Sequence, residues 1–130
     1  MTDRFADIIQ GRKYSVAFTK SASKDFGKLK KDRGQDSSRL KGLIRKFCDY
    51  GGPFQDHQFK REESFKLDGR TVVVYQFRSN QVRVYGGYID NCKIFACTKV
   101  HIKKTNKADM KMLENVAKTL VQLDRGNNHG

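Results

Sequence analysis

Residues 65–104 read FKLDGRTVVVYQFRSNQVRVYGGYIDNCKIFACTKVHIKK, and this stretch predicts an antiparallel sheet. Three runs within it are rich in β-branched and aromatic residues, which favour strands. The predicted strands span 71–78, 81–89 and 93–100, after a shorter strand at 64–67. Turn residues separate them, namely Asp68-Gly69, Ser79-Asn80 and Asp90-Asn91. Gly86-Gly87, inside the middle run, indicates a β-bulge.

The turn Ser79-Asn80 predicts which side chains share a face of this sheet. If it is a two-residue turn, Arg78 lies opposite Gln81, and Gln76 then lies opposite Arg83. Because side chains alternate along a strand, one surface collects Gln76, Arg78, Gln81, Arg83 and Tyr85. The other surface carries Tyr75, Phe77, Val82 and Val84, which predicts the core. The hairpin thus presents one apolar face and one polar, cationic face.

Upstream of this sheet the sequence predicts one strand and two helices. The weakly alternating run at 14–19 predicts the strand. Two helices follow at about 21–31 and 37–50, each beginning at a serine that can cap its N-terminus. Gly51-Gly52-Pro53 ends the second helix. The short connection between the helices predicts an antiparallel hairpin whose outer faces are rich in Lys and Arg.

Downstream of the sheet, Asn106 predicts the N-cap of a helix that runs to about residue 123. Its predicted apolar face consists of Leu113, Val116, Ala117 and Leu120. The whole chain therefore predicts an α+β fold: an N-terminal strand, a two-helix hairpin, an antiparallel sheet of about four strands and a C-terminal helix. We expect one domain over 1–130, with a loosely docked N-terminal extension at 1–13 and a disordered tail at 125–130.

The charge of the chain indicates the class of partner. Lys and Arg number 27 against 14 Asp and Glu, a formal net charge of +13. The excess is spread through the chain and is not confined to a basic tail. Such a field favours a polyanion, and nucleic acid is preferred here over an anionic membrane or an acidic protein.

The cysteines and the apolar runs indicate the compartment. Three isolated cysteines form no CxxC pair, which argues against a disulfide framework and against zinc. The first ten residues lack the features of a signal peptide, and no apolar run approaches 18 residues. We therefore expect a cytoplasmic protein with no membrane partner.

Cations on and beside the predicted polar face are the candidate ligands for phosphate. Arg78 and Arg83 share that face, and a guanidinium binds phosphate oxygens in a bidentate way at any working pH. Lys103 and Lys104 follow the last strand and can hang over its edge. Each is also consistent with an ordinary solvated residue, and only their grouping favours a site. Further candidates for contacts with a nucleic-acid backbone are Lys60, Arg61 and Lys66.

Other chemistry has few candidates. His101 and His57 are the plausible general bases, because the imidazole pKa lies near neutral pH. Glu62 and Glu63 are consistent with local charge balance, and the acidic residues are too scattered to predict a metal site. The chain has no GxxxxGK[ST], GxGxxG, HExxH or serine nucleophile motif. We expect neither a metal nor another cofactor.

Four short motifs carry a resemblance to a known family. They are Tyr75-Gln-Phe-Arg78, Arg83-Val-Tyr85, the run 93–98, and Lys103-Lys104-Thr105-Asn106-Lys107-Ala108. With the order of strand, two helices, sheet and helix, the chain resembles the RelE/ParE toxin superfamily of type II toxin–antitoxin systems. The closer likeness is to its HigB-like and phage-encoded branch, and it covers roughly residues 14–120.

The resemblance implies a RelE-like fold and a ribosome-dependent mRNA endonuclease that needs no metal. Such toxins enter the ribosomal A site, where the RNA's own 2′-hydroxyl attacks the adjacent phosphate and leaves a 2′,3′-cyclic phosphate. The implied partners are mRNA, the ribosome and a cognate antitoxin protein. An acidic or amphipathic antitoxin would cover the basic face.

The resemblance also implies roles for particular residues. Those that match by position are Arg78, Arg83, Lys103, Lys104, Tyr85 and His101. The arginines would bind the scissile phosphate, and one of the lysines would donate a proton or clamp the phosphate. The tyrosine would stack on a base or hydrogen-bond to it, and the histidine is a candidate base. A different alignment of the strands moves the site toward Lys66 and Arg70.

Two other functions are compatible with the same scaffold. One is a ParE-like toxin that poisons DNA gyrase without catalysis and depends on the helical hairpin. The other is a non-catalytic nucleic-acid-binding or inhibitory module. Cations gathered around one phosphate-sized site favour the enzyme, whereas dispersed charge favours the binding module.

Overall fold

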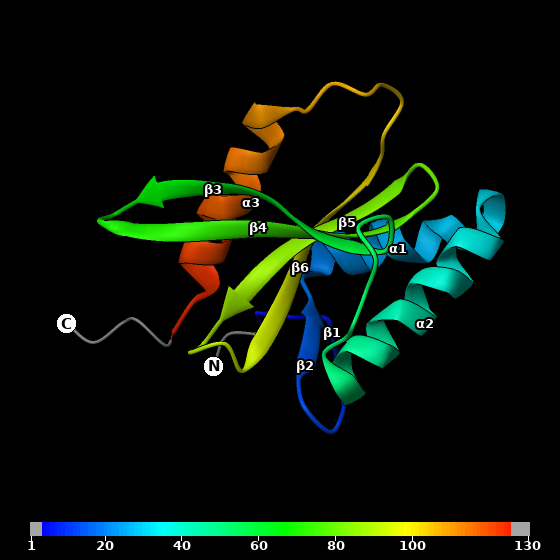
Figure 1. The fold of residues 1–130 in the computed structure, drawn as a ribbon, viewed down its shortest axis with the longest axis horizontal. Coiled ribbons are helices and arrows are strands. Elements are labelled where there is room, and N and C mark those ends of the chain that lie inside the picture. Colours follow the sequence, from blue (N-terminus) through cyan, green and yellow to red (C-terminus); the bar gives the residue numbers. More distant parts are fainter. Residues whose placement is uncertain (1–3, 126–130) are drawn as a thin grey trace.

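The computed structural model describes residues 4–125 and has an α+β fold with three helices and one six-stranded mixed sheet (Figure 1). The strands are β1 Asp7–Gln10, β2 Ser15–Phe18, β3 Phe59–Leu67, β4 Arg70–Ser79, β5 Val82–Ile89 and β6 Ile94–Ile102. The helices are α1 Lys20–Asp32, α2 Gly34–Tyr50 and α3 Met110–Leu123. The predicted α+β class is confirmed, while residues 126–130 of the predicted tail at 125–130 lie outside the described residues. Within the described part, no helix is both long and apolar enough to cross a membrane.

The helical hairpin forms as expected, with different starting points. The hydroxyl of Thr19 caps α1 by accepting a hydrogen bond from the backbone N–H of Ala22 at 3.2 Å, ahead of the predicted serines. α2 begins at Gly34, about one turn early, because the single residue Arg33 joins the two helices. It ends at Gly51, whose φ of 78° makes a left-handed C-cap, as predicted.

The C-terminal helix begins later than predicted. Asp109 caps α3 by accepting a hydrogen bond from the backbone N–H of Met112 at 3.0 Å. The prediction of Asn106 as the cap is therefore wrong. The predicted apolar face is confirmed, since the buried residues of the helix are Leu113, Val116, Ala117 and Leu120.

The sheet has more strands than predicted and is not antiparallel throughout. β1 lies inside the predicted loose extension and pairs antiparallel with β2, which pairs parallel with β6. The strand order is β1-β2-β6-β5-β4-β3. Gly11 shows how closely the β1–β2 turn lies on α2, because a Cβ there would come within 2.5 Å of Cys48. β3 has 9 residues and starts well before the predicted strand at 64–67.

The register of the β4–β5 hairpin differs from the prediction, but its faces do not. Arg78 lies opposite Arg83, so the predicted pairing is wrong by two residues. The turn is formed by Asn80 and Gln81, with Asn80 in the left-handed region at a φ of 53°. A shift of two residues preserves the alternation of side chains. The residues predicted to share a face within the strands therefore still do.

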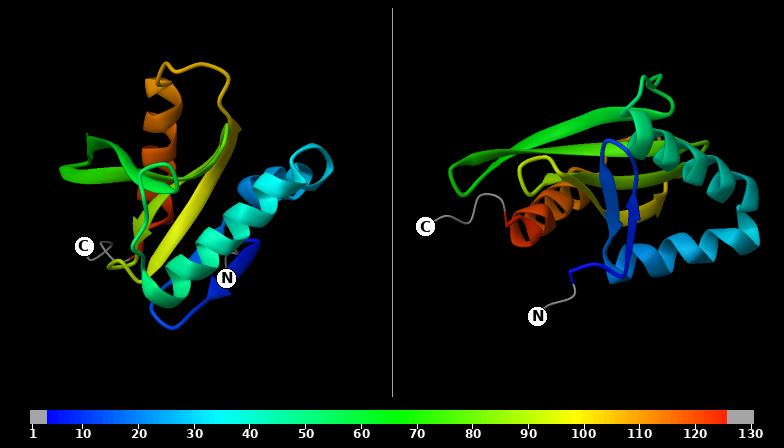
Figure 2. Two further views of the ribbon diagram at one scale, coloured as in Figure 1. Left: turned by 45° about the vertical axis from the view of Figure 1, so that its right-hand side comes forward. Right: turned by 90° about the horizontal axis from the view of Figure 1, so that it is seen from below.

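Different helices cover the two faces of the sheet (Figure 2). On β4, Phe77 is buried with α1 and α2, whereas Val74 is buried against α3. The α1–α2 side is aromatic, with the ring centroid of Phe47 5.6 Å from that of Phe77. Because Arg78 and Arg83 alternate with apolar neighbours of that core, they lie on the α3 face.

Candidate functional site

A pocket of about 320 Å³ lies on the α3 face, between β3, β4, β5 and the segment that follows β6. It is lined by Lys60, Glu62, Gln76, Arg78, Gln81, Arg83, Lys103, Lys104, Thr105 and Asn106. We call it the basic pocket, since five of these residues are cations and one is an acid. All five cations were candidates from the sequence, and the fold brings them together.

Strand pairing and one backbone hydrogen bond place the cations around this pocket. Arg78 on β4 lies opposite Arg83 on β5, and their side chains share a face. Lys60 comes from β3, the next strand in the sheet. Lys103 is held at the end of the hairpin because its backbone N–H donates to the carbonyl of Gln81 at 2.7 Å. Residues far apart in the sequence therefore converge on one opening.

Arg83 is the most buried cation of the pocket. Its side chain and backbone together are 7% exposed. Nη1 donates to the carbonyl oxygens of Asn80 and, at 3.2 Å, Val82. These bonds fix the guanidinium against the hairpin turn without neutralising its charge.

The charge of the two arginines is not balanced by an ion pair. Within residues 4–125, neither Arg78 nor Arg83 forms a salt bridge, and the same holds for the three lysines of the basic pocket. The Nε atoms of both arginines are buried and have no hydrogen-bond partner in the described part of the chain. A buried N–H donor without an acceptor is costly, so these two Nε–H groups suit an anion that enters from outside.

The electrostatics of Arg83 agree with this geometry. Burial lowers the pKa of Arg83, and the facing charge of Arg78 lowers it further, while Tyr85 and Glu62 act in the opposite direction. Like charges directly opposite each other destabilise a pair of strands. A phosphate between the two guanidinium groups would relieve that repulsion and fill their bidentate geometry.

Glu62 is a functional candidate that the sequence interpretation missed. It sits where the β3–β4 register shifts between Arg61 and Glu63, and it lines the basic pocket. Its Oε2 accepts a hydrogen bond from Nε2 of the buried Gln76 at 2.7 Å. Glu62 follows Lys60 by two residues, and this spacing places two side chains on the same face of a strand. The signal was not used because the strand was expected to start only at residue 64. A carboxylate among several cations can accept a proton from a substrate.

His101 and Tyr85 line a second pocket of about 380 Å³ that adjoins the first. His101 on β6 lies opposite Arg83. Burial lowers the pKa of His101, Lys99 and Arg83 lower it further, and Asp109 acts against them. A lowered pKa favours the neutral imidazole, which is the form that can accept a proton.

Tyr85 is less available than the predicted role in base stacking requires. It is 3% exposed and packs in the cluster formed with α3. Burial raises the pKa of Tyr85, and the charge of Glu62 raises it further. Its hydroxyl keeps its proton, so it can donate a hydrogen bond, but its ring is not an open stacking surface.

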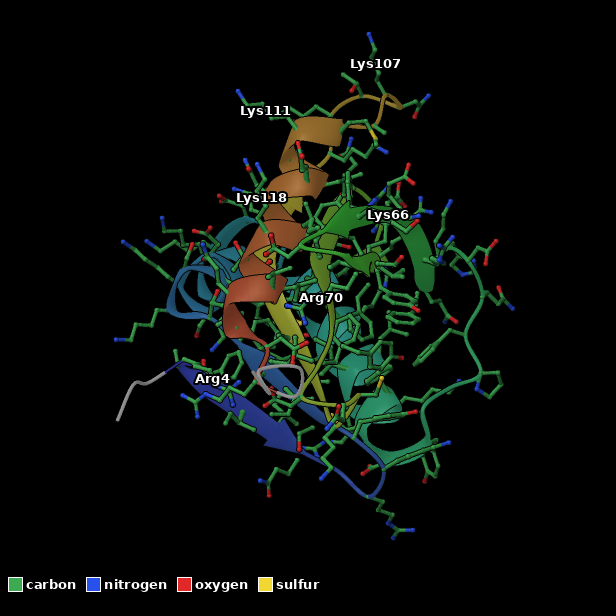
Figure 3. The ribbon with its side chains drawn as sticks, turned by 90° about the vertical axis from the view of Figure 1, so that its left-hand side faces the viewer. Arg4, Lys66, Arg70, Lys107, Lys111 and Lys118 are labelled. Atoms are coloured by element: carbon green, nitrogen blue, oxygen red, sulfur yellow. The ribbon has the colours of Figure 1, made fainter. Side chains whose placement is uncertain are left out.

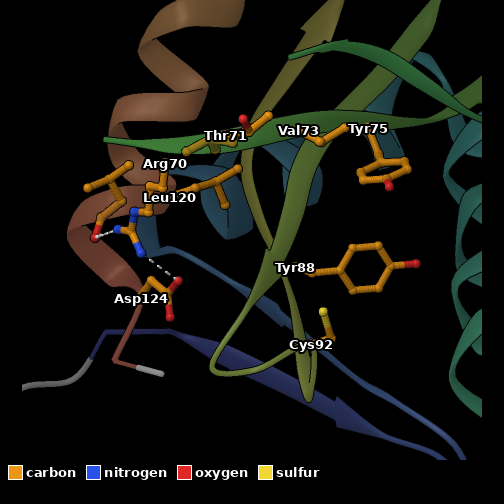
Figure 4. A pocket seen from close by; sticks show the side chains of 10 residues that line it. Arg70, Thr71, Val73, Tyr75, Tyr88, Cys92, Leu120 and Asp124 are labelled. Atoms are coloured by element: carbon orange, nitrogen blue, oxygen red, sulfur yellow. Dashed lines mark hydrogen bonds and ion pairs between the residues drawn. The ribbon is translucent and has the colours of Figure 1, made fainter. Parts of the chain in front are cut away.

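The remaining candidates lie elsewhere. Figure 3 shows Lys66 and Arg70 on the β3–β4 hairpin beside α3, and neither lines the basic pocket. The guanidinium of Arg70 bonds to Asp124 at 3.2 Å and lines a separate pocket of about 250 Å³ (Figure 4). Arg61 is exposed, pairs with Tyr75 across the strands and lines neither of the two adjoining pockets. In the described part of the chain, the alternative site through Lys66 and Arg70 is thus separate from the pocket that contains Arg78.

Comparisons with known proteins leave the family open. No protein-family model, curated protein or solved structure was found to match this chain. The likeness to the RelE/ParE superfamily remains a prediction from four short motifs and the order of the elements. The geometry and charge of the basic pocket are therefore the basis for assigning a function.

Proposed function

We propose that this chain is a RelE-like toxin of a type II toxin–antitoxin system that cleaves mRNA in the ribosomal A site. The observation that carries the proposal is the basic pocket, where Arg78 and Arg83 face each other without an ion-pair partner in the described residues. Lys60, Lys103 and Lys104 complete the ring of cations. Such a pocket suits one phosphate of an RNA backbone.

The basic pocket and the pocket that adjoins it supply the groups that the reaction needs. The RNA's 2′-oxygen attacks the adjacent phosphorus while the bond from phosphorus to the 5′-oxygen breaks, which leaves a 2′,3′-cyclic phosphate and a 5′-hydroxyl. Glu62 or the neutral His101 accepts the 2′-hydroxyl proton. An ammonium of Lys103 or Lys104 donates a proton to the leaving oxygen. Arg78 and Arg83 stabilise the charge that develops on the phosphorane.

The proposed setting follows from the same chemistry. The substrate is mRNA held by the ribosome, the location is the cytoplasm, and no metal takes part. The net charge of +13 favours association with the ribosome's RNA and with an acidic antitoxin that covers the basic pocket.

Induced expression followed by mapping of RNA 5′ ends tests the proposal. We expect growth arrest and cuts inside translated codons for the natural chain, and neither for Arg78→Ala/Arg83→Ala. Lys66→Ala/Lys118→Ala removes the same charge from exposed positions outside the basic pocket and should still cut. Arrest without RNA cuts would point to gyrase or another target. Cuts that persist in the folded arginine variant would remove Arg78 and Arg83 from the site.

Charge outside the pocket favours a second candidate, the non-catalytic nucleic-acid-binding module. Figure 3 shows Lys111 and Lys118 projecting from α3, and neither lysine lines the basic pocket or the pocket that adjoins it. Such dispersed cations bind a polyanion without orienting one phosphate. RNA binding with no arrest and no cuts would favour this candidate.

A further inference from the structure

The basic pocket and the second pocket, which contains His101, share part of their lining. Lys103, Lys104 and Thr105 line both pockets. A phosphate bound between Arg78 and Arg83 would have this second pocket beside it, and an RNA strand that extended along the shared wall would enter it. The next group to be accommodated is then a nucleotide base.

The adjoining pocket has a different chemical character from the basic pocket. Ile102 and Met112 contribute apolar surface, which suits the faces of a base. Lys107 and the shared lysines supply hydrogen-bond donors, and Asp109 supplies the one carboxylate of the lining. Its volume of about 380 Å³ is within the range of small-molecule sites.

Asp109 is placed to act as an acceptor in this pocket. Its Oδ1 accepts the capping hydrogen bond from the backbone N–H of Met112, which fixes the carboxylate at the first turn of α3. The other oxygen takes no hydrogen bond within the described residues. The carboxylate also lies close enough to influence the pKa values of Tyr85 and His101, which line the same pocket. The carboxylate of Asp109, a hydrogen-bond acceptor, and the lysine ammonium groups, which are donors, therefore line the same pocket.

We propose that the adjoining pocket binds the base next to the scissile phosphate and prefers guanine through Asp109. Guanine presents N1–H and the N2 amino group, two adjacent donors for a carboxylate. Its O6 and N7 accept hydrogen bonds from lysine. Uracil presents one N–H between two carbonyl oxygens, and these oxygens are repelled by a carboxylate. This inference rests on the proposed cleavage of RNA in the basic pocket, and it adds the nucleotide that the site selects.

Nucleotide binding to the full chain tests the inference without ribosomes. Isotope-labelled protein is titrated with 3′-GMP and with 3′-UMP, and the dissociation constants are taken from amide chemical shifts. We expect GMP to bind about tenfold more tightly than UMP, the discrimination of one good bidentate contact. The amides that respond only to GMP should lie at 101–112.

Asp109→Asn is the informative variant, because asparagine is as good an N-cap as aspartate and leaves α3 intact. Its amide offers donors where guanine also offers donors, so the ratio of GMP to UMP affinity should fall to about two or less. Glu114→Gln is the matched control, since it removes one carboxylate from α3 outside the adjoining pocket and should keep the natural ratio.

The outcomes separate this inference from the proposed function. Equal affinity for GMP and UMP in the natural chain, or an unchanged ratio in Asp109→Asn, overturns the guanine pocket while leaving the phosphate site standing. Loss of binding of both nucleotides in Arg78→Ala/Arg83→Ala supports the phosphate site. Binding of neither nucleotide by the natural chain at millimolar concentration overturns both the phosphate site and the guanine pocket.

Discussion

Oδ1 of Asp36 accepts a hydrogen bond from Nδ2 of Asn80 at 2.8 Å, which ties the first turn of α2 to the β4–β5 turn. The same oxygen accepts a bond from Oγ of Ser79 at 2.7 Å. Asn80 also provides a carbonyl that accepts from Nη1 of Arg83. The buried carboxylate therefore fixes, through the turn, the arginine that is central to the basic pocket.

Asp36→Asn should destabilise the protein by about 2 kcal/mol, because hydrogen bonds to a charged group contribute roughly 1.5–3 kcal/mol and the position is buried. Urea unfolding monitored by circular dichroism measures the change. Asp32→Asn is the matched control, since Asp32 is exposed at the end of α1 and should change stability by less than about 0.5 kcal/mol. Equal losses in the two variants would show that Asp36 does not hold the turn.

The stabilisation by Asp36 should depend on pH. Burial by itself would raise the pKa of Asp36, but the bonds from Ser79 and Asn80, with the charges of Arg33 and Arg39, hold that pKa below its ordinary value. The contribution is therefore complete above the unfolded pKa of about 3.9 and is lost as the pH falls through the lower folded value. Unfolding curves from pH 6 to pH 2.5 should show a steeper acid loss for the natural chain than for Asp36→Asn. Parallel curves would contradict the lowered pKa.

Inorganic phosphate should stabilise the protein through the basic pocket. At ten times its dissociation constant, a ligand that binds only the native state adds about 1.4 kcal/mol, or roughly 5 °C in Tm. Arg78→Ala/Arg83→Ala should lose this increase, and Lys66→Ala/Lys118→Ala should keep it. Thermal scans in phosphate and in sodium chloride of equal ionic strength provide the measurement. The same increase in chloride would show general screening and no phosphate site.

The residue that accepts the 2′-hydroxyl proton can be identified by comparing two variants. Glu62→Gln keeps the shape of the side chain that contacts Gln76 but cannot take a proton. We expect it to slow cleavage by about 10²–10⁴-fold, the usual contribution of a general base. The rate of cleavage of one transcript in a translation extract measures this. Glu63→Gln is the control, since Glu63 bonds to the backbone N–H of Ser64 and does not line the basic pocket. A larger loss in His101→Gln than in Glu62→Gln would assign the proton to His101.

The sequence predicted the faces of the central hairpin better than its pairing. Alternation depends only on neighbouring residues, so Arg78 and Arg83 were placed on the polar face although their register was wrong by two. The position of the turn depends on whether Ser79 or Asn80 takes the left-handed conformation, and both residue types occur in turns. The cationic half of the candidate site could therefore be predicted from the sequence.

Features that depend on distant partners were not predictable. β1 has 4 residues and is stabilised by pairing with β2, and the parallel pairing of β2 with β6 joins residues about 80 positions apart. The first half of β3 contains four charged residues in succession, Lys60, Arg61, Glu62 and Glu63, which conceals a strand. Glu62 was missed for that reason, and the shared wall of the two pockets depends on how the segment after β6 folds back.

The β5–β6 pairing is irregular at the predicted position, Gly86-Gly87, but the bulge lies on the partner strand: Tyr85 pairs with Lys99 and Gly86 with Cys97, which leaves Thr98 of β6 as the extra residue. A Cβ at Gly86 would come within 2.1 Å of the carbonyl oxygen of Ala96, which is backbone and cannot move aside. Gly86→Ala should therefore destabilise the protein by at least about 2 kcal/mol in urea unfolding.

Gly27→Ala tests whether the cost at Gly86 comes from the close approach of the two strands. It makes the same substitution on α1, where a Cβ would meet nothing within 4 Å. Alanine is the better helix former, so this variant should gain up to about 1 kcal/mol. A loss of stability in Gly86→Ala together with a gain in Gly27→Ala would show that the loss at Gly86 comes from contact with β6. A Gly86→Ala protein as stable as the natural chain would show that the strands can separate there, and the bulge would then not fix the pairing of Arg83 with His101.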